Sequence, residues 1–382
     1  MTILYDPQIF TTQRQGGVSR YFANLIQDMD KKGENISCPL IFSARFNENI
    51  YLSKIRHCIK EESKIHPILD RTDQILHGAW KRKFRSWAEN VTYKSCRAEI
   101  AHAGQFCQCT PWFLSHPRLV VTVHDMIHET ILLKRANPLP DWQTYSNNKR
   151  RYIDHSQLII AISEHTKNEL AREWHIDENR IRVIHHSNPF ENIDIPDAEP
   201  VPPYILYVGA RDFYKNFSRF LQAVAPLLGE NQALSIVCTG LPTFSREENE
   251  LIRGLHLENR IQTKIVNDDE LVRLYRNARV FVFPSLAEGF GLPLLEAFSC
   301  RCPVCCSNTS CFPEIAGEAA SYFDPTSVTS MRDAISRVIN DNAYRESLIE
   351  KGAHRATKFT HEKTSQLTWQ VYQEVINSSS QI

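Results

Sequence analysis

The sequence predicts an α/β protein of two domains, each with a parallel sheet and flanking helices. Short runs that are apolar throughout recur along the chain, as in strands that are buried on both faces of a parallel sheet. Segments with one apolar face at helical spacing separate these runs. The alternation occurs twice, on either side of a proline-rich break, and a length of 382 residues favours two cores over one.

The expected strands are the apolar runs themselves. They span 3–5, 119–123, 158–162, 204–208, 234–238 and 280–283. Between them, 18–29 and 217–227 place apolar residues at i, i+3, i+4 and i+7, which predicts amphipathic helices. The pattern turns helical after Asp324, and a last helix is expected near 361–376.

The domain boundary is expected in an acidic segment that contains Pro189, Pro196, Pro200, Pro202 and Pro203. Prolines at this density allow neither a helix nor a central strand. The segment therefore predicts an N-terminal domain over 1–190, a linker over 191–203 and a C-terminal domain over 204–360.

Composition excludes several classes of protein. The formal net charge is zero and the pI is about 7.2, so nothing in the overall charge favours nucleic acid as a partner. No apolar run approaches the roughly 18 to 20 residues of a membrane span, and 1–10 does not have the pattern of a signal peptide. An odd number of cysteines, 11, fits reduced thiols. We therefore expect a cytoplasmic protein.

Five of the cysteines lie between 300 and 311, and they include a C-x-x-C spacing that could ligate zinc. No second C-x-x-C or pair of histidines follows them. Free cysteine is among the most buried residue types, so we favour buried thiols over a metal site.

Ligands of open α/β sheets bind beyond the carboxyl ends of the strands, which directs attention to three places. Gly16 and Gly17 open a helix after the first strand, a geometry that suits an anion as well as a plain tight turn. His124 ends a strand beside Asp125, as a catalytic or a structural histidine would. Ser163 is most simply a helix N-cap.

The third place is in the C-terminal half. Arg211 and Lys215 follow one strand, and a glycine loop with Glu288 and Glu296 follows another. Two cations near free N–H groups at the start of a helix suit a diphosphate. The carboxylates differ in position, because Glu288 lies before the helix and Glu296 about one turn inside it.

Here the chain resembles the family 4 retaining glycosyltransferases of GT-B fold. The residues that carry the resemblance are E-G-F-G-L-P-L-L-E at 288–296, V-G-A-R-D-F-Y-K-N-F at 208–217, G-G-V-S-R-Y at 16–21 and T-V-H-D at 122–125. Shorter matches at 161–167, 312–317 and 320–325 follow in order. The likeness is strongest to members of polysaccharide and lipopolysaccharide assembly, many of them mannosyltransferases.

The resemblance implies two Rossmann-like domains that face each other across a cleft, with a C-terminal helix, 361–378, that crosses back to the first domain. It implies that His124 and Glu288 contact the transferred sugar, without a covalent role for Glu288. The residues that it implies for binding of the nucleotide-sugar donor are Arg211, Lys215, Gly289, Phe290, Gly291, Leu292, Glu296, Gly16 and Gly17.

Three features bear on these implications. Arg301 stands where the family usually has glycine, and Cys305 and Cys306 replace commoner aliphatic residues. Asp28-Met29-Asp30 has the D-x-D form of a metal motif, but Met29 belongs to the apolar face of a helix. We expect no cofactor and a transfer that is independent of metal, as the fold implies.

An apolar stripe between residues 80 and 91 bears on the location of the protein in the cell. Trp80, Phe84, Trp87 and Val91 have helical spacing among basic residues, so they could pack on their own domain or contact an anionic membrane, with peripheral attachment to the inner face of the plasma membrane.

The leading hypothesis is transfer of a hexose from a nucleotide sugar to a growing or lipid-linked glycan, with mannose from GDP-mannose as the first candidate. UDP-linked hexose or N-acetylhexosamine donors remain open. A nucleotide-sugar epimerase and a donor-binding scaffold without turnover are the further alternatives.

Overall fold

The computed structural model describes residues 1–11, 16–37, 49–58 and 97–378. The chain divides into two compact units, one of Met1–Ser187 with His361–Ile382 and one of Asn188–Thr360. The proline-rich segment lies at the start of the second unit, where the N–H of Asn188 donates to the carbonyl of Phe359 at 2.8 Å and Arg276 Nε donates to the carbonyl of Pro196 at 3.2 Å. The stripe at Trp80–Val91 lies outside the described residues.

The first unit is built on a parallel sheet whose described strands have the order β2-β1-β3-β4-β5-β6. All neighbouring pairs are parallel. The strands are β1 (Thr2–Tyr5), β2 (Asn35–Ser37), β3 (Ile100–Ala103), β4 (Leu119–Val123), β5 (Leu158–Ala161) and β6 (Ile181–Val183).

Side chains alternate between the two faces of this sheet and build a separate core on each. On one face, Ile3, Tyr5 and Ile160 pack with α2 (Gly17–Lys31), α15 (His361–Ser378), the 3₁₀ helix η1 (Ile50–Cys58) and α1 (Gln8–Thr11). On the other, Leu4, Val121 and Ile159 pack with α5 (Pro111–Ser115), α6 (Pro140–His155) and α7 (Glu164–Trp174). Two short helical turns, η2 (His128–Leu132) and η3 (Glu178–Arg180), are the remaining described elements of the unit.

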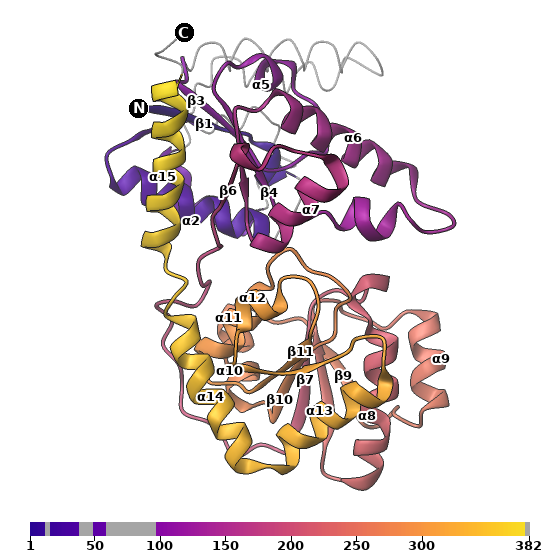
Figure 1. Ribbon diagram of the computed structural model, residues 1–382. Helices are drawn as coiled ribbons and strands as arrows, with labels where there is room; N and C mark the ends of the chain where they lie inside the picture. The colour runs from indigo at the N-terminus through magenta and orange to yellow at the C-terminus, as the bar shows by residue number, and fades with distance from the viewer. Residues whose placement is uncertain (12–15, 38–48, 59–96, 379–382) are drawn as a thin grey trace, which may run out of the picture. The chain divides into compact units, whose positions relative to one another are not determined.

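The C-terminal helix α15 belongs to the first unit, as the resemblance implied, and it lies beside α2 in Figure 1. Val371, Tyr372 and Val375 are buried in the core of that unit. The Tyr372 hydroxyl also hydrogen bonds with the Tyr5 hydroxyl at 3.1 Å and with His102 Nδ1 at 2.5 Å. Removal of this helix would therefore uncover both apolar and polar groups.

The second unit contains another parallel sheet, with the described strands in the order β12-β11-β10-β7-β8-β9. The strands are β7 (Tyr204–Val208), β8 (Ser235–Thr239), β9 (Ile261–Lys264), β10 (Val280–Phe283), β11 (Val304–Ser307) and β12 (Ala320–Phe323). The helices are η4 (Phe213–Lys215), α8 (Phe217–Glu230), α9 (Arg246–Gly254), α10 (Asp268–Asn277), α11 (Leu292–Ser299), α12 (Phe312–Ala316), α13 (Val328–Asn340) and α14 (Asn342–Ala356).

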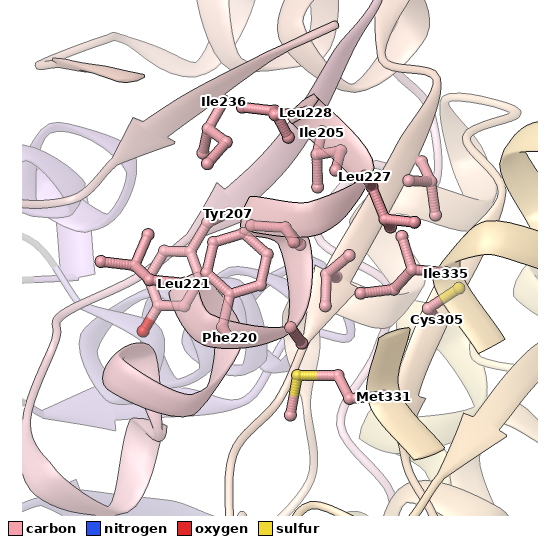
Figure 2. Close-up of a cluster of buried hydrophobic side chains, with 14 of the residues drawn as sticks. Ile205, Tyr207, Phe220, Leu221, Leu227, Leu228, Ile236, Cys305, Met331 and Ile335 are labelled. Carbon is pink, nitrogen blue, oxygen red and sulfur yellow. The ribbon is translucent and has the colours of Figure 1, made fainter. Parts of the chain in front are cut away.

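One face of this second sheet is covered by α8 and α13. Figure 2 shows Phe220 and Leu221 of α8 and Met331 of α13 against strand residues such as Tyr207 and Cys305. The apolar spacing that predicted the helix at 217–227 is therefore the spacing that faces the sheet. Pro226 lies inside α8 without ending it.

The cysteines confirm the expectation of burial. Cys300, Cys302, Cys305, Cys306 and Cys311 are all buried, and burial raises the pKa of each thiol. In the part of the chain that the structure describes, no helix is both long and apolar enough to cross a bilayer.

Candidate functional site

The order of the strands marks one point in the second sheet where ligands of such folds bind. From β7 the chain winds outward to β8 and β9 on one side, and then to β10, β11 and β12 on the other. In open α/β sheets this topological switch point opens a crevice at the carboxyl ends of the two strands. The loops that follow β7 and β10 carry Lys215 and Glu288, so the topology brings together residues that the sequence keeps far apart.

Lys215 and Glu288 form an ion pair at this switch point. Lys215 Nζ lies 2.6 Å from Glu288 Oε1, and the Ser285 hydroxyl donates to the same oxygen at 2.7 Å. Both side chains are mostly buried, with 17% and 12% of their surfaces exposed. Burial is the largest single influence and opposes the charge on Lys215, but Glu288, Tyr214 and Asp212 together outweigh it, so the pKa of Lys215 is raised. The site therefore keeps a fixed cation beside a carboxylate.

Arg211, which follows the same strand as Lys215, is held by protein groups. Its Nε donates to Glu248 Oε1 at 2.8 Å, and another nitrogen donates to the carbonyl of Thr243. The guanidinium lies over the rings of Phe244 and Phe217, 4.8 and 5.5 Å from their centroids, and 1% of the side chain is exposed. Nη1 is buried and has no hydrogen-bond partner among the described residues. Of the two cations, Lys215 is the more accessible.

The glycine loop between β10 and α11 has the backbone conformation that its sequence requires. Gly291 precedes the first residue of α11, Leu292, and adopts φ 91°, a left-handed conformation that side chains other than glycine rarely adopt. Gly289 and Phe290 are buried before it. The first turn of α11 thus begins beside Glu288, with its dipole positive at that end.

Glu296 lies inside α11 and is buried, with 7% exposed. The Tyr275 hydroxyl donates to its Oε2 at 3.1 Å. Burial and the nearby carboxylate raise the pKa of Tyr275 well above its usual value, so this phenol remains a hydrogen-bond donor. Two residues after α11, Arg301 has φ 55°, which is the left-handed conformation that explains why glycine is usual there.

In the first unit, His124 directly follows β4, as expected from the sequence. Its Nδ1 lies 3.3 Å from Nε2 of His186, and the two rings stack. Its Nε2 is shielded from water and has no hydrogen-bond partner in the described part of the chain. Burial lowers the pKa of His124 to about 4, against the opposing effect of Asp125. The imidazole is therefore neutral at physiological pH.

The turn after His124 is held by a buried ion pair. Lys149 on α6 is 1% exposed, and its Nζ donates to the carbonyl of Asp125 at 2.9 Å and to Glu129 Oε2 at 2.9 Å. Glu129 lies in η2, a π-helical turn, and such turns are frequent at functional sites. Glu129 Oε1 and Nδ1 of the neighbouring His128 are buried without a partner among the described residues.

The glycine pair lies at the start of α2. Gly16 is the N-cap, in an extended conformation, and Gly17 is exposed as the first residue of the helix. Among the described residues no side chain caps this end, and its N–H groups are hydrogen-bond donors for a ligand. Ser163 accepts from the N–H of Thr166 at 3.0 Å, so its predicted role as an N-cap is confirmed.

The predicted residues thus fall into two groups. Lys215, Glu288, Glu296 and the glycine loop gather at the switch point of the second sheet, with Arg211 bound to Glu248 nearby, whereas His124, Gly16 and Gly17 belong to the first unit. Sequence reasoning missed the partners that hold these groups, namely Ser285, Tyr275, Glu248, His186 and Lys149. Of these, His186 gives a signal in retrospect, because it lies in the loop after β6, three residues past the end of the strand.

Two units with parallel sheets of this order place the protein in the GT-B class of glycosyltransferase folds. The structure of sucrose-phosphate synthase from Thermosynechococcus elongatus superposes with a TM-score of 0.74 at 17% identity and covers 99% of this chain and 100% of its own. WaaG, a glycosyltransferase involved in lipopolysaccharide biosynthesis, gives a TM-score of 0.69 at 14% identity, with 96% and 99% covered.

The sequence also identifies the family. Residues 15–187 match the model described as Glycosyltransferase Family 4, and residues 190–355 match that of Glycosyl transferases group 1. O-antigen chain mannosyltransferase B of Escherichia coli is 26% identical over 379 residues, which cover 93% of this chain and 95% of that protein. The first unit therefore matches a family 4 glycosyltransferase domain and the second a group 1 glycosyltransferase domain, and together the two matches cover most of the chain.

Proposed function

We propose that this glycosyltransferase moves a hexose from a nucleotide sugar to a glycan acceptor, with the donor held by the second unit. The observation that carries the proposal is the Lys215–Glu288 pair at the switch point, next to the glycine loop and the start of α11. A nucleoside diphosphate sugar carries a diphosphate beside a ring of hydroxyls. A fixed cation and helix N–H groups suit the diphosphate, and a carboxylate suits the sugar hydroxyls.

The cation has a chemical task in such a reaction. When the bond between the sugar C1 and the phosphate oxygen breaks, negative charge develops on the diphosphate leaving group. Lys215 remains protonated because its pKa is raised, so it can stabilise this charge without a proton transfer. Arg211 adds to the positive field, and its Nη1, which has no partner among the described residues, is the nitrogen left for a phosphate.

We infer that the transfer retains the anomeric configuration. The acceptor hydroxyl attacks C1 on the face that the diphosphate leaves, and its proton passes to the departing phosphate oxygen. Glu288 Oε1 is already engaged by Lys215 and Ser285, which suits a carboxylate that holds sugar hydroxyls better than a free nucleophile. Glu296 would accept from the ribose hydroxyls, and His124 would meet the transferred sugar from the first unit.

Mannose from GDP-mannose is our first candidate for the donor. It rests on the relative of nearly equal length that is named an O-antigen chain mannosyltransferase. The name of the same relative suggests a polysaccharide chain as the acceptor, and we propose a growing or lipid-linked glycan. We further propose that the transfer needs no metal ion, because Lys215 and the start of α11 can supply the positive charge that a metal would otherwise provide.

A thermal-shift panel tests this proposal directly. The protein is heated with GDP, UDP, dTDP and ADP and with their common sugar conjugates, in buffer that contains EDTA. A ligand that binds only the folded state raises the free energy of unfolding, by about 2.7 kcal/mol at a ligand concentration of 100 times Kd. The melting temperature rises with it. We expect GDP and GDP-mannose to give the largest shift.

Two variants sharpen the panel. Lys215→Met should abolish the shift, whereas Lys351→Met removes a lysine from an exposed ion pair with Glu318 in the same unit and should leave it unchanged. A shift with UDP alone would replace mannose from GDP-mannose with a UDP-linked sugar. No shift with any nucleotide, or a shift that Lys215→Met leaves intact, would overturn the proposed donor site.

A further inference from the structure

His124, which is partly buried, is in contact with a buried histidine, His186, that belongs to none of the motifs described above. The Nδ1 of His124 and the Nε2 of His186 are 3.3 Å apart, which is within hydrogen-bond reach, and the ring centroids are 5.4 Å apart. His186 follows β6 and is 3% exposed. The contact therefore joins the ends of two strands, β4 and β6, that do not neighbour each other in the sheet.

The surroundings fix the position of His186. The Tyr21 ring of α2 packs edge-on against His186, with centroids 4.2 Å apart. The hydroxyl of Thr364 on α15 donates to the carbonyl of the preceding residue, His185, at 2.9 Å. His186 is thus held by two helices, while His124 meets the rings of Tyr21 and Phe22 edge-on at 5.9 Å.

The number of protons on the two rings links the contact to the tautomer of His124. Burial lowers the pKa of both histidines, so each imidazole is neutral and carries one N–H. A hydrogen bond between the two facing nitrogens holds one proton. If His186 donates, the proton of His124 must be on Nε2. If His124 donates, its Nε2 must be an acceptor. In either case the contact at Nδ1 decides what the unpartnered Nε2 offers to a ligand.

We propose that His186 is a positioning residue for His124, whose ring orientation and tautomer it fixes through the Nδ1–Nε2 hydrogen bond. The effect on turnover rests on the proposed function, because it requires that His124 meets the transferred sugar. The contact itself does not depend on that function.

The charged and titratable groups around the pair come from several elements. Asp125 follows β4 and favours the charged form of His124, whereas Lys149 of α6 opposes it. His102 of β3 and His185 of the loop after β6 interact with His124 and His186, respectively, and Tyr21 of α2 faces both rings. The test therefore compares two variants of His186 itself, so that all of these neighbouring groups stay the same.

The experiment uses the full-length chain with ¹⁵N-labelled histidine. His186→Phe keeps an aromatic ring against Tyr21 but has no ring nitrogen to bond with His124. His186→Gln provides a side-chain amide that can donate a hydrogen bond to His124 or accept one from it. His124→Asn identifies the His124 signals in the NMR spectrum. The melting temperature of each variant shows whether it folds.

We expect His124 of the unsubstituted protein to show one protonated and one unprotonated ring nitrogen, unchanged between pH 8 and pH 6. In His186→Phe the two ring-nitrogen signals of His124 should move toward a common position, because the two tautomers then exchange. In His186→Gln the two signals should separate again. A fixed tautomer that survives in His186→Phe would overturn the proposal, as would identical spectra of the Phe and Gln variants.

Turnover supplies the second readout. With the donor identified by the thermal-shift panel, His186→Phe should lower kcat by about tenfold or more, with partial rescue by His186→Gln and an unchanged KM for the donor. Averaged tautomers with an unchanged kcat would overturn the positioning role. An unsubstituted protein that transfers no sugar would instead count against the proposed function, while the NMR arm would still decide the contact.

Discussion

Among the described residues of the first unit, three histidines have a strongly lowered pKa: His102 and His186 are buried and His124 is partly buried. His102 is fully buried, with Nδ1 against the Tyr372 hydroxyl at 2.5 Å and Nε2 against the Thr122 hydroxyl at 2.7 Å. Burial lowers the pKa of His102 to about 3 and that of His124 to about 4, and it lowers the pKa of His186 as well. All three pKa values lie below that of a histidine in the unfolded chain, about 6.5.

This difference predicts that the first unit is sensitive to acid. Below about pH 6.5 the unfolded chain binds protons that the folded unit cannot bind, so the free energy of unfolding falls as the pH falls toward 4. Each such histidine would cost about 2 kcal/mol at pH 5. Thermal melts between pH 8 and pH 5 should therefore show a falling melting temperature, and His102→Gln should make the fall less steep. An equal slope in the variant would contradict this assignment.

The elements show which parts of the fold the sequence could predict. β4, β7 and β10 were found because their residues are apolar throughout, and a strand that is buried on both faces leaves that signal. β3 and β11 were missed, since they read I-A-H-A and V-C-C-S, and a buried histidine or cysteine does not look apolar. β9 at the sheet edge is half-exposed and alternates I-Q-T-K, which is too short to separate from a loop.

The same limit applies to the candidate site. The glycine loop and its two glutamates form a local pattern that the sequence shows directly. The Lys215–Glu288 pair joins loops that are 73 residues apart, so it follows only from the strand order. Lys149 is polar and lies on a helix, and nothing local indicates that packing buries it completely.

The ion pair between α6 and η2 leads to a prediction about element packing. Lys149→Met leaves Glu129 buried without its cation and should destabilise the first unit by about 3–5 kcal/mol. The double variant Lys149→Met with Glu129→Gln should recover most of that loss, because no charge is left unpaired. Denaturant unfolding measures both.

Lys134→Met is the matched control, because it breaks an ion pair with Glu173 in which the lysine is 59% exposed. Such a surface pair contributes about 0–1 kcal/mol. If Lys149→Met costs no more than Lys134→Met, the buried pair does not hold the turn after His124.

At the scale of the whole molecule, the chain leaves the first unit after Ser187 and returns to it with α15. The first unit therefore consists of two pieces of chain, whereas Asn188–Thr360 is continuous. A change in α15 should then affect the stability of the first unit and not that of the second.

Tyr372→Ala tests this division. The side chain is fully buried and bonds to Tyr5 and His102, so its loss should destabilise the first unit by about 3–5 kcal/mol. Calorimetry should show one transition that moves to lower temperature and one that stays in place. Gln370→Ala, at an exposed position of the same helix, should move neither. A single transition that moves as a whole would show that the two units unfold together.

We propose that Glu288 at the switch point acts on the transferred sugar and not on the nucleotide. The most direct measurement compares Glu288→Ala with the unsubstituted protein, with sugar transfer and nucleoside diphosphate affinity determined on the same samples. We predict that turnover falls by about a hundredfold or more while the Kd for the nucleoside diphosphate stays nearly unchanged. Turnover that survives the substitution, or nucleotide binding that is lost with it, would contradict the claim.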